Sequence, residues 1–219
     1  VSKASGLPTI VDADTGYGDA TEVAHTVVAY EAAGVHAIQL EDQTWPKRCG
    51  HMDGKTVVST SEMVEKLRAA CEARSSADTL IIARTDAVAV EGFDAALERM
   101  GAYADAGADV LFVEAPEDRE QLRRIPAELP QRPHVVNLAP RTPSCSVEEL
   151  QAMGYSLAIF PGLCFMAQLE ASRAALKSLR ENGTQDNLTQ WTHDFKEINA
   201  FLGNGARARA SISEIEMQQ

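Results

Sequence analysis

The sequence predicts an α/β fold, a (β/α)8 TIM-type barrel, of which about six βα units lie within the 219 residues. Short apolar segments alternate with helical patterns, which is typical of parallel strands covered by helices. The segment 30–41 is echoed by 103–114: in each, a helix ends at Ala-Gly and an apolar strand follows and ends at a glutamate. A fainter third copy covers 152–161. Repeated βα units without a glycine-rich nucleotide motif favour a barrel over a doubly wound sheet.

The first elements lie between residues 9 and 41. Apolar residues predict a strand over 9–14, which ends at the turn 15–18. Apolar residues at helical spacing then predict a helix over 19–33, with Asp19 as its cap and Gly34 at its end. A strand over 36–41 follows.

The middle of the chain repeats this order. Ser59 and Glu62 have the spacing of a capping box, so a helix is expected from there to about Arg74. An apolar strand over 80–83 is followed by a helix over 93–106, and a strand over 110–113 comes next.

The last βα elements are shorter. We expect a helix over about 118–125, a strand over 135–137, a capping box at 146–149, a strand over 155–160 and a helix over about 163–181. Residues 1–182 therefore form the predicted barrel domain. Because a closed barrel of this type has eight strands and six are found, two βα units are expected to precede residue 1.

Residues 183–219 are expected to form a helical tail. Trp191, Phe195, Ile198 and Leu202 make one apolar stripe at helical spacing. Packing on its own barrel and contact with a partner subunit are both open for this stripe. Residues 203–219 are expected to be mobile.

The composition restricts the partners and the compartment. A net charge of -12 argues against nucleic acid and anionic membranes as partners. Four cysteines show neither zinc spacing nor a disulfide framework, which indicates a reducing, cytoplasmic compartment. The longest apolar stretch, 157–167, is too short to cross a bilayer, and no signal peptide opens the chain. A mitochondrial location stays open, because residues are expected before residue 1.

The polar loop after the second strand holds the most distinctive residues. Cys49 stands among Lys47, Arg48 and His51, and Gly50 frees the backbone beside it. Nearby positive charge stabilises a thiolate, so the loop predicts a reactive cysteine. The alternative is a buried thiol that packs as a small hydrophobe.

The strand ends carry a ring of carboxylates, and the active site of such a barrel lies at this end. Asp12 and Asp14 point to the same side of their strand, and Glu41 ends the next strand. Adjacent carboxylates that repel one another suit a divalent cation, Mg²⁺ or alternatively Mn²⁺. An ordinary Asx turn is the alternative for Asp12 and Asp14.

One cation stands in this ring. Arg84 is suited to binding a substrate carboxylate. A salt bridge with Glu114 is the structural alternative, and both roles are compatible.

Four motifs carry a family resemblance. They are Val-Asp-Ala-Asp-Thr-Gly-Tyr-Gly (11–18), Leu-Glu-Asp-Gln (40–43), Lys-Arg-Cys-Gly-His (47–51) and Ala-Arg-Thr-Asp-Ala (83–87). In order and spacing over about residues 7–180 the chain resembles the isocitrate lyase/phosphoenolpyruvate mutase superfamily, most of all methylisocitrate lyase and 2,3-dimethylmalate lyase. The resemblance implies an eight-stranded barrel and a homotetramer whose subunits exchange a C-terminal helix.

The resemblance also implies roles for single residues. Asp12 would bind Mg²⁺ directly, and Asp14 and Glu41 would hold it through water. Cys49 would be the catalytic acid or base on a mobile loop, with Lys47, Gly50 and His51 as its partners. The groups implied to contact the substrate are Arg84, Glu114 and Asn137.

The implied reaction is the Mg²⁺-dependent cleavage of a 2-hydroxy di- or tricarboxylate into a 2-oxo acid and a carboxylate. After Asn137 the lyases often carry a hydroxyl residue and an acidic or glycine-rich run, where this chain has Leu-Ala-Pro-Arg (138–141). Because that loop contacts the variable substituent, the substrate stays open. An oxaloacetate hydrolase or decarboxylase and a phosphonate-forming mutase are alternatives within the superfamily. A barrel without activity that serves as an assembly subunit is the alternative from another class.

Overall fold

The computed structural model describes residues 6–185 and 195–203. The chain divides into two units, residues 1–162 and residues 163–219.

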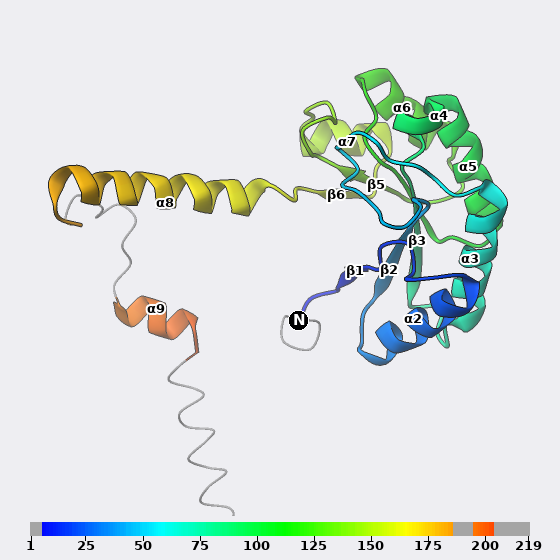
Figure 1. Cartoon of the computed structure of the whole chain (residues 1–219), viewed down its shortest axis with the longest axis horizontal. Coiled ribbons are helices and arrows are strands. Elements are labelled where there is room, and N and C mark those ends of the chain that lie inside the picture. Colours follow the sequence, from blue (N-terminus) through cyan, green and yellow to red (C-terminus); the bar gives the residue numbers. More distant parts are fainter. Residues whose placement is uncertain (1–5, 186–194, 204–219) are drawn as a thin grey trace, which may run out of the picture. The chain divides into compact units, whose positions relative to one another are not determined.

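Six parallel strands form one curled sheet in the first unit (Figure 1). The strands are β1 (Ile10–Asp12), β2 (Ala37–Glu41), β3 (Leu80–Thr85), β4 (Val110–Val113), β5 (His134–Asn137) and β6 (Leu157–Ile159). Their spatial order equals their order in the sequence, as expected for successive βα units. All six predicted strands are confirmed. Among the described residues β1 and β6 each pair on one side, so the sheet is an open half-barrel and the eight-stranded closure stays a prediction.

The helices of the first unit pack on the convex face of this sheet (Figure 1). They are α2 (Ala20–Ala32), α3 (Thr60–Ala73), α4 (Val88–Glu91), α5 (Phe93–Asp105), α6 (Arg119–Glu128) and α7 (Val147–Met153). Only α4 was not expected. It is a single turn, closed by hydrogen bonds from the backbone N–H groups of residues 90–92 to the Ala87 carbonyl, and so is too short to show periodicity.

Alternate residues of each strand enter different cores. Ile38 and Ile81 pack toward the helices, beside buried residues such as Met100 of α5. Ile82 and Phe112 face the concave side and form a second, smaller cluster with Val135. Burial of each such side chain stabilises the fold by about 1.5–3 kcal/mol. The period of two residues therefore fixes which strand residues can face the concave cavity.

The predicted caps are largely confirmed. Asp19 Oδ1 accepts hydrogen bonds from the backbone N–H groups of Thr21 and Glu22 at 2.8 and 3.4 Å. Ser146 and Glu149 form a reciprocal capping box. The box predicted at Ser59 is only half formed. Ser59 Oγ accepts from the backbone of Glu62, but the Glu62 carboxylate lies 3.8 Å from the ammonium of Lys66, which is a stronger partner than a backbone N–H.

The second unit contains α8 (Leu163–Asn182) and α9 (Phe195–Phe201). None of the twenty residues of α8 is buried, and large apolar side chains such as Leu163, Phe165 and Leu176 are exposed. In the predicted tail stripe, Ile198 and Leu202 are exposed, whereas Trp191 and the side chain of Phe195 lie outside the described residues. The unit boundary lies before α8, and the predicted domain boundary at residue 182 stays a prediction.

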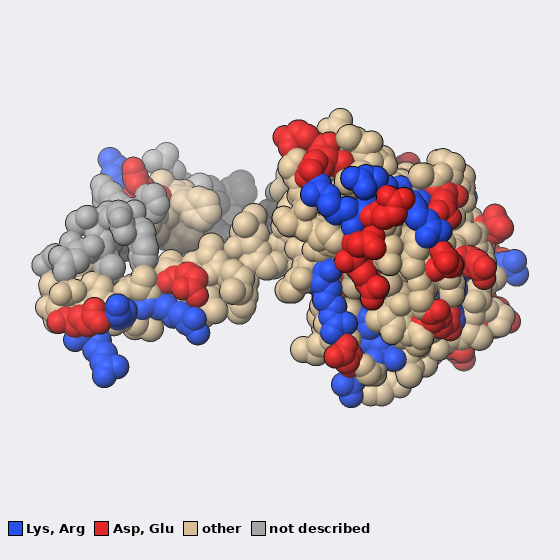
Figure 2. All heavy atoms as spheres, turned by 90° about the horizontal axis from the view of Figure 1, so that it is seen from above, with Lys and Arg blue, Asp and Glu red and all other residues tan. Residues whose placement is uncertain are grey.

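Surface charge and helix length bear on possible partners. Figure 2 shows acidic and basic side chains interspersed on the face of the first unit that it draws. Within the parts of the chain that the structure describes, no helix combines the length and apolar character needed to cross a membrane.

Candidate active site

The polar strand ends meet above a cavity on the concave side of the sheet. The cavity has a volume of about 330 Å³, and its wall includes Asp12, Arg84 and Asn137 together with the apolar rings and chains of the smaller core. The parallel register explains the meeting: Asp12 pairs with Gln39, and Glu41 pairs with Arg84. The predicted residues of five different strands are therefore brought to one edge.

Arg84 is the buried cation at the centre of this edge. Its Nε and Nη2 donate to the two carboxylate oxygens of Asp86 at 2.9 and 3.2 Å, and Nη1 lies 3.3 Å from Glu114 Oε2. The guanidinium also lies over the Phe112 ring, 5.3 Å from its centre. Burial alone would lower the pKa of Arg84, but the surrounding carboxylates outweigh burial and raise it, so the group stays charged. The salt bridge to Glu114 is present, which leaves the role in substrate binding as a prediction.

Asp42 supports Arg84 from below the site. Its carboxylate is fully buried and accepts hydrogen bonds from Thr85 Oγ1 at 2.6 Å, Tyr103 Oη at 2.8 Å and the backbone N–H of Asp86 at 2.9 Å. Burial raises the pKa of Asp42 despite these donors. The network fixes the position of Asp86 and, through it, the orientation of Arg84.

Asp12 and Asp14 share one cation in the structure. Lys47 Nζ lies 2.7 Å from Asp14 Oδ1 and 4.0 Å from Asp12 Oδ2. Asp12 Oδ1 also accepts from the backbone N–H of Asp14 at 2.9 Å, so the Asx-type turn that was the alternative interpretation is formed. The turn uses one oxygen of Asp12 and leaves the other directed to a cation, so it is compatible with metal binding.

Glu41 is a buried carboxylate without a hydrogen bond. Neither of its oxygens has a hydrogen-bond partner, although Arg84 Nε lies 3.5 Å from Oε2. Burial raises the pKa of Glu41 to about 7, and Arg84 acts in the opposite direction. Its backbone N–H donates to the Asp14 carbonyl at 2.8 Å, so this carboxyl group stands beside the Asp12–Asp14 turn.

The donor set fits a hard cation held largely through water. In residues 6–185 and 195–203, no three His, Cys, Asp or Glu side chains converge closely enough to bind one ion directly. Mg²⁺ characteristically keeps several waters and uses one or two carboxylates. The unpaired oxygens of Glu41 are the groups that such bound water would satisfy.

The loop of residues 44–58, named the lid below, lies against the strand ends. Gly50 touches them most closely: a Cβ at this position would stand 2.4 Å from Glu114 Cγ and 2.5 Å from Arg84 Nη2. His51 Nε2 lies 2.9 Å from Glu114 Oε1, and its Nδ1 accepts from the backbone N–H of Arg141 at 3.1 Å. Asn137 Nδ2 donates to both oxygens of Glu114 at 3.2 Å. The structure thus brings Gly50, His51, Arg84, Glu114 and Asn137 together.

Cys49 is exposed on the lid and its thiol is free, as are the thiols of Cys71, Cys145 and Cys164. The three predicted cations around this thiol each contact another group, and their role toward Cys49 stays a prediction. Lys47 binds the β1 carboxylates, His51 contacts Glu114, and Arg48 Nη1 donates to the Asp53 carbonyl. Carboxylate and carbonyl oxygens at hydrogen-bonding distance stabilise these cations more strongly than a solvent-exposed sulfur does.

Two residues of the site were missed in the sequence. Gln43 donates through Nε2 to the Arg48 carbonyl at 2.8 Å and accepts from the Arg48 backbone N–H at 2.9 Å, which fixes the start of the lid. Lys55 is buried against Asp86, with Nζ 3.2 Å from Oδ1. A polar residue in a polar loop gives no local sign of burial; only the position of Asp86 just past a strand end was available as a signal.

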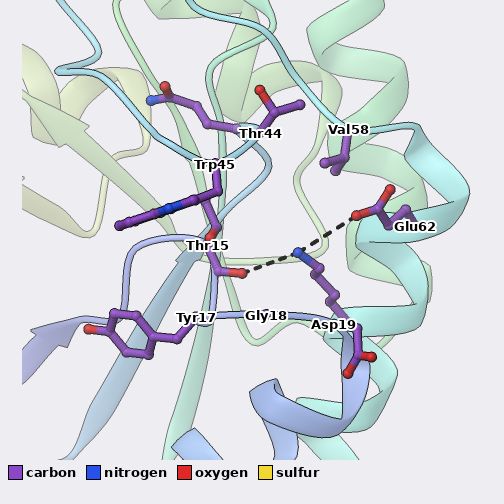
Figure 3. A pocket seen from close by; sticks show the side chains of 10 residues that line it. Thr15, Tyr17, Gly18, Asp19, Thr44, Trp45, Val58 and Glu62 are labelled. Atoms are coloured by element: carbon purple, nitrogen blue, oxygen red, sulfur yellow. Dashed lines mark hydrogen bonds and ion pairs between the residues drawn. The ribbon is translucent and has the colours of Figure 1, made fainter.

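A second cavity of about 700 Å³ lies beside the lid (Figure 3). Tyr17 and Trp45 form its aromatic wall, and Figure 3 shows an ammonium group between the Thr15 carbonyl and Glu62. This is Lys66, whose Nζ lies 3.4 Å from the Thr15 oxygen. The lining of this cavity includes Gln43 and lid residues such as Trp45, but none of Asp12, Glu41, Arg84, Glu114 and Asn137.

Comparison with known proteins assigns the family. Residues 1–180 match the family described as phosphoenolpyruvate phosphomutase. The chain is 42% identical over 205 residues to 2,3-dimethylmalate lyase of Eubacterium barkeri and covers 71% of that protein with 93% of its own length. It is also 42% identical over 205 residues to 2-methylisocitrate lyase of Aeropyrum pernix, with 93% of this chain and 66% of the relative covered. The chain thus spans about two thirds of the length of these lyases.

Solved structures agree. The crystal structure of 2,3-dimethylmalate lyase, a PEP mutase/isocitrate lyase superfamily member, matches with a TM-score of 0.87 and 34% identity, covering 96% of this chain and 71% of that one. Phosphonopyruvate hydrolase in complex with oxalate and Mg²⁺ matches with a TM-score of 0.83 and 29% identity over 95% of this chain and 73% of that one. The chain belongs to the phosphoenolpyruvate mutase/isocitrate lyase superfamily, in which its relatives at 42% identity are carbon–carbon lyases.

Proposed function

We propose that the protein is a Mg²⁺-dependent carbon–carbon lyase that cleaves a 2-hydroxy di- or tricarboxylate similar to methylisocitrate or dimethylmalate. The observation that carries this proposal is the packing of Gly50 on Glu114 and on Arg84, which brings the cysteine-bearing lid against a residue that lines the strand-end cavity. The lyase names of the relatives at 42% identity support the same reaction class.

The metal would be held by the carboxylates of the first two strands. Asp12 is the proposed direct ligand, and Asp14 and Glu41 the proposed water-mediated ones; the unpaired oxygens of Glu41 support this assignment. When bound there, Mg²⁺ supplies Lewis-acid polarisation of the substrate's hydroxyl and carboxylate oxygens. Lys47 would then turn from the aspartates to the substrate, because the metal takes over the charge that it now balances.

The chain's own residues account for the remaining steps. The substrate hydroxyl passes its proton to one of the strand-end carboxylates, and its carbon becomes the carbonyl of a 2-oxo acid as the adjacent carbon–carbon bond breaks. The bonding electron pair stays on the carbon next to the second fragment's carboxylate, as an enolate-like dianion. Arg84 stabilises this charge, and Cys49 delivers the proton that completes the product. The closed lid excludes water from the dianion.

Glu114, His51 and Asn137 would act around this centre. Glu114 accepts from Asn137 and contacts both Arg84 and His51, so it can hold all three side chains in position. The backbone of Gly50 would approach the substrate, since its lack of a side chain allows the lid to lie on the strand ends.

Hydrolysis or decarboxylation of oxaloacetate is the second candidate. The loop 138–141 favours it, because this loop replaces the run that usually follows the asparagine and contacts the lid through Arg141. A shorter or differently charged substituent would suit this loop. A phosphonate-forming mutase is less favoured, since it would not use the thiol of Cys49.

We also propose a cytoplasmic homotetramer whose subunits exchange a C-terminal helix. The absence of buried residues in α8 supports this, because the apolar side chains of a twenty-residue helix are stabilised only when something covers them. Sedimentation equilibrium of the protein and of a variant with Phe165→Lys tests the exchange. The variant should dissociate; a variant that stays tetrameric would exclude α8 from the interface.

The reaction is tested by incubating the protein with Mg²⁺ and methylisocitrate, isocitrate, dimethylmalate or oxaloacetate, and measuring the 2-oxo acid or oxalate formed. The lyase proposal predicts release of pyruvate or glyoxylate from one of the first three substrates. Exclusive release of oxalate from oxaloacetate would establish the hydrolase instead.

A further inference from the structure

Three side chains of the lid contact carboxylates at the ends of three different strands. Lys47 contacts Asp14 after β1, and His51 contacts Glu114 after β4. The third is Lys55, which contacts Asp86 after β3 at 3.2 Å. The lid is therefore docked on the sheet by groups that can each balance one carboxylate.

Lys55 differs from the other two in its surroundings. Its side chain is only 1% exposed, compared with 10% for His51 and 28% for Lys47. The ammonium group of Lys55 forms two hydrogen bonds within the chain. Its Nζ donates to the Asp86 carboxylate and to the carbonyl oxygen of Gly50. Lys55 is not among the residues that line the strand-end cavity, and its contacts stabilise the segment of the lid that packs on Arg84.

Asp86 joins this lysine to the active-site arginine. One of its oxygens, Oδ1, lies 3.2 Å from both Lys55 Nζ and Arg84 Nη2, while Oδ2 accepts from Arg84 Nε at 2.9 Å. Asp86 is completely buried. A buried carboxylate shared by two cations holds each less tightly than it would hold one alone, because its charge is divided between them.

Of the described residues outside the lid, Arg84 is the cation in contact with three buried carboxylates, Glu41, Asp86 and Glu114. Docking of the lid adds Lys55 to one of them and His51 to another. Through Lys55 the lid supplies positive charge to the ring when it docks. Arg84 Nη1 and Nη2 are then freer to bind a substrate carboxylate.

We propose that Lys55 is a positioning residue that couples docking of the lid to the orientation of Arg84, by binding Asp86 from the lid side and the carbonyl of Gly50 at the same time. This proposal deepens the proposed lyase function and rests on it where it concerns substrate. The coupling itself concerns contacts within the chain and is measured without substrate.

The first experiment measures hydrogen–deuterium exchange of residues 44–58 in the full chain without substrate. Lys55→Met should raise exchange there by about tenfold or more, the factor expected from one charge-assisted hydrogen bond. Asp86→Asn should raise it similarly. In the double variant the two effects should not add, because both remove the same contact. If the two effects are fully additive, the proposed coupling is wrong.

Lys55→Gln and Arg123→Met complete this experiment. The glutamine variant removes the charge and the reach of Nζ but keeps a polar side chain, and it tests the same contact if the methionine variant does not fold. Its exchange should also rise, and wild-type exchange would overturn the proposal. Arg123 is an exposed cation that lies 3.5 Å from Glu120 within α6. Arg123→Met should leave exchange of the lid unchanged, and an equal rise there would show that any lost cation loosens the lid.

The second experiment measures binding of oxalate in the presence of Mg²⁺ by calorimetry, with Mn²⁺ affinity as a separate readout. Lys55→Met should weaken oxalate binding by about tenfold, while Mn²⁺ affinity stays within about twofold of wild type, since Asp12 and Asp14 are not in contact with Lys55. Unchanged oxalate affinity would refute the effect on Arg84. Failure of the wild-type protein to bind oxalate or to cleave any of the candidate substrates would instead refute the proposed function, and the exchange result would still decide the coupling.

Discussion

Replacement of Gly50 by alanine should separate the lid from the strand ends. The added Cβ would lie 2.4 Å from Glu114 Cγ, 2.5 Å from Arg84 Nη2 and 2.9 Å from Asp86 Oδ1, whereas ordinary contacts of this kind begin near 3.4 Å. The backbone of Gly50 has no positive φ, so the effect comes from this overlap and not from backbone strain.

The magnitude follows from the surroundings. Glu114 and Asp86 are almost completely buried and Arg84 nearly so, and all three are held by one another, so none can retreat by 1 Å without loss of an ion pair. Overpacking of a well-packed site costs about 1–3 kcal/mol. If the docked lid alone loses this free energy, kcat/KM should fall roughly 5- to 150-fold.

The assay measures kcat/KM of Gly50→Ala on the substrate that the screen identifies, together with amide exchange of residues 44–58. Gly101→Ala is the matched control, since a Cβ at Gly101 in α5 would meet no atom within 4 Å. The control should retain activity and gain up to about 1 kcal/mol of stability from improved helix propensity. Wild-type kcat/KM and unchanged exchange in Gly50→Ala would refute the argument that the lid docks through this contact.

Three further predictions concern the metal, the acid and pH. Asp12→Ala should abolish divalent-metal binding, because it removes the proposed direct carboxylate ligand; Mn²⁺ affinity at wild-type strength would remove Asp12 from the metal site. Cys49→Ser should lower turnover by a factor of about 10² to 10⁴ with little change in substrate affinity, since a hydroxyl is a far weaker acid; turnover within threefold of wild type would exclude Cys49 as the acid. Burial lowers the pKa of His134, so its neutral form stabilises the folded state, and this stability is present above pH 6.5, near the pKa of an unfolded histidine, and is lost as the pH falls below it. The free energy of unfolding of His134→Gln, measured with urea, should therefore depend less on pH between 7 and 5 than that of wild type. The control His25→Gln replaces an exposed histidine and should keep the pH dependence of wild type.

The six strands were predictable because each is a local pattern with a marked end. Apolar residues stop at Glu41, Arg84 and Glu114, and such boundaries depend on neighbours in sequence. The meeting of these residues was predictable too, since parallel strands end at one edge. The short helix α4 and the half-formed box at Ser59 were not, because both depend on which partner competes best for a few hydrogen bonds.

The partners of the lid residues were beyond local inference. Lys55 contacts a residue 31 positions away, and Lys47 contacts the preceding βα unit. Their positions next to Cys49 in the sequence predicted that Lys47 and His51 stabilise its thiolate. In the structure Lys47 contacts Asp14 and His51 contacts Glu114. The identity of the loop residues could thus be predicted, but the direction of their side chains depends on the folded sheet.

The lid contacts have a mechanical consequence for the half-barrel. Among the described residues β1 and β6 each pair on one side, so contacts across the concave mouth add to the hydrogen bonds within the sheet. The lid contacts carboxylates that follow three strands across the concave mouth. Lys47 contacts a carboxylate shortly after β1, Lys55 one directly after β3 and His51 one directly after β4. The lid is thus bound to three strands at once, so any change in the spacing of these strand ends changes the contacts that hold the lid.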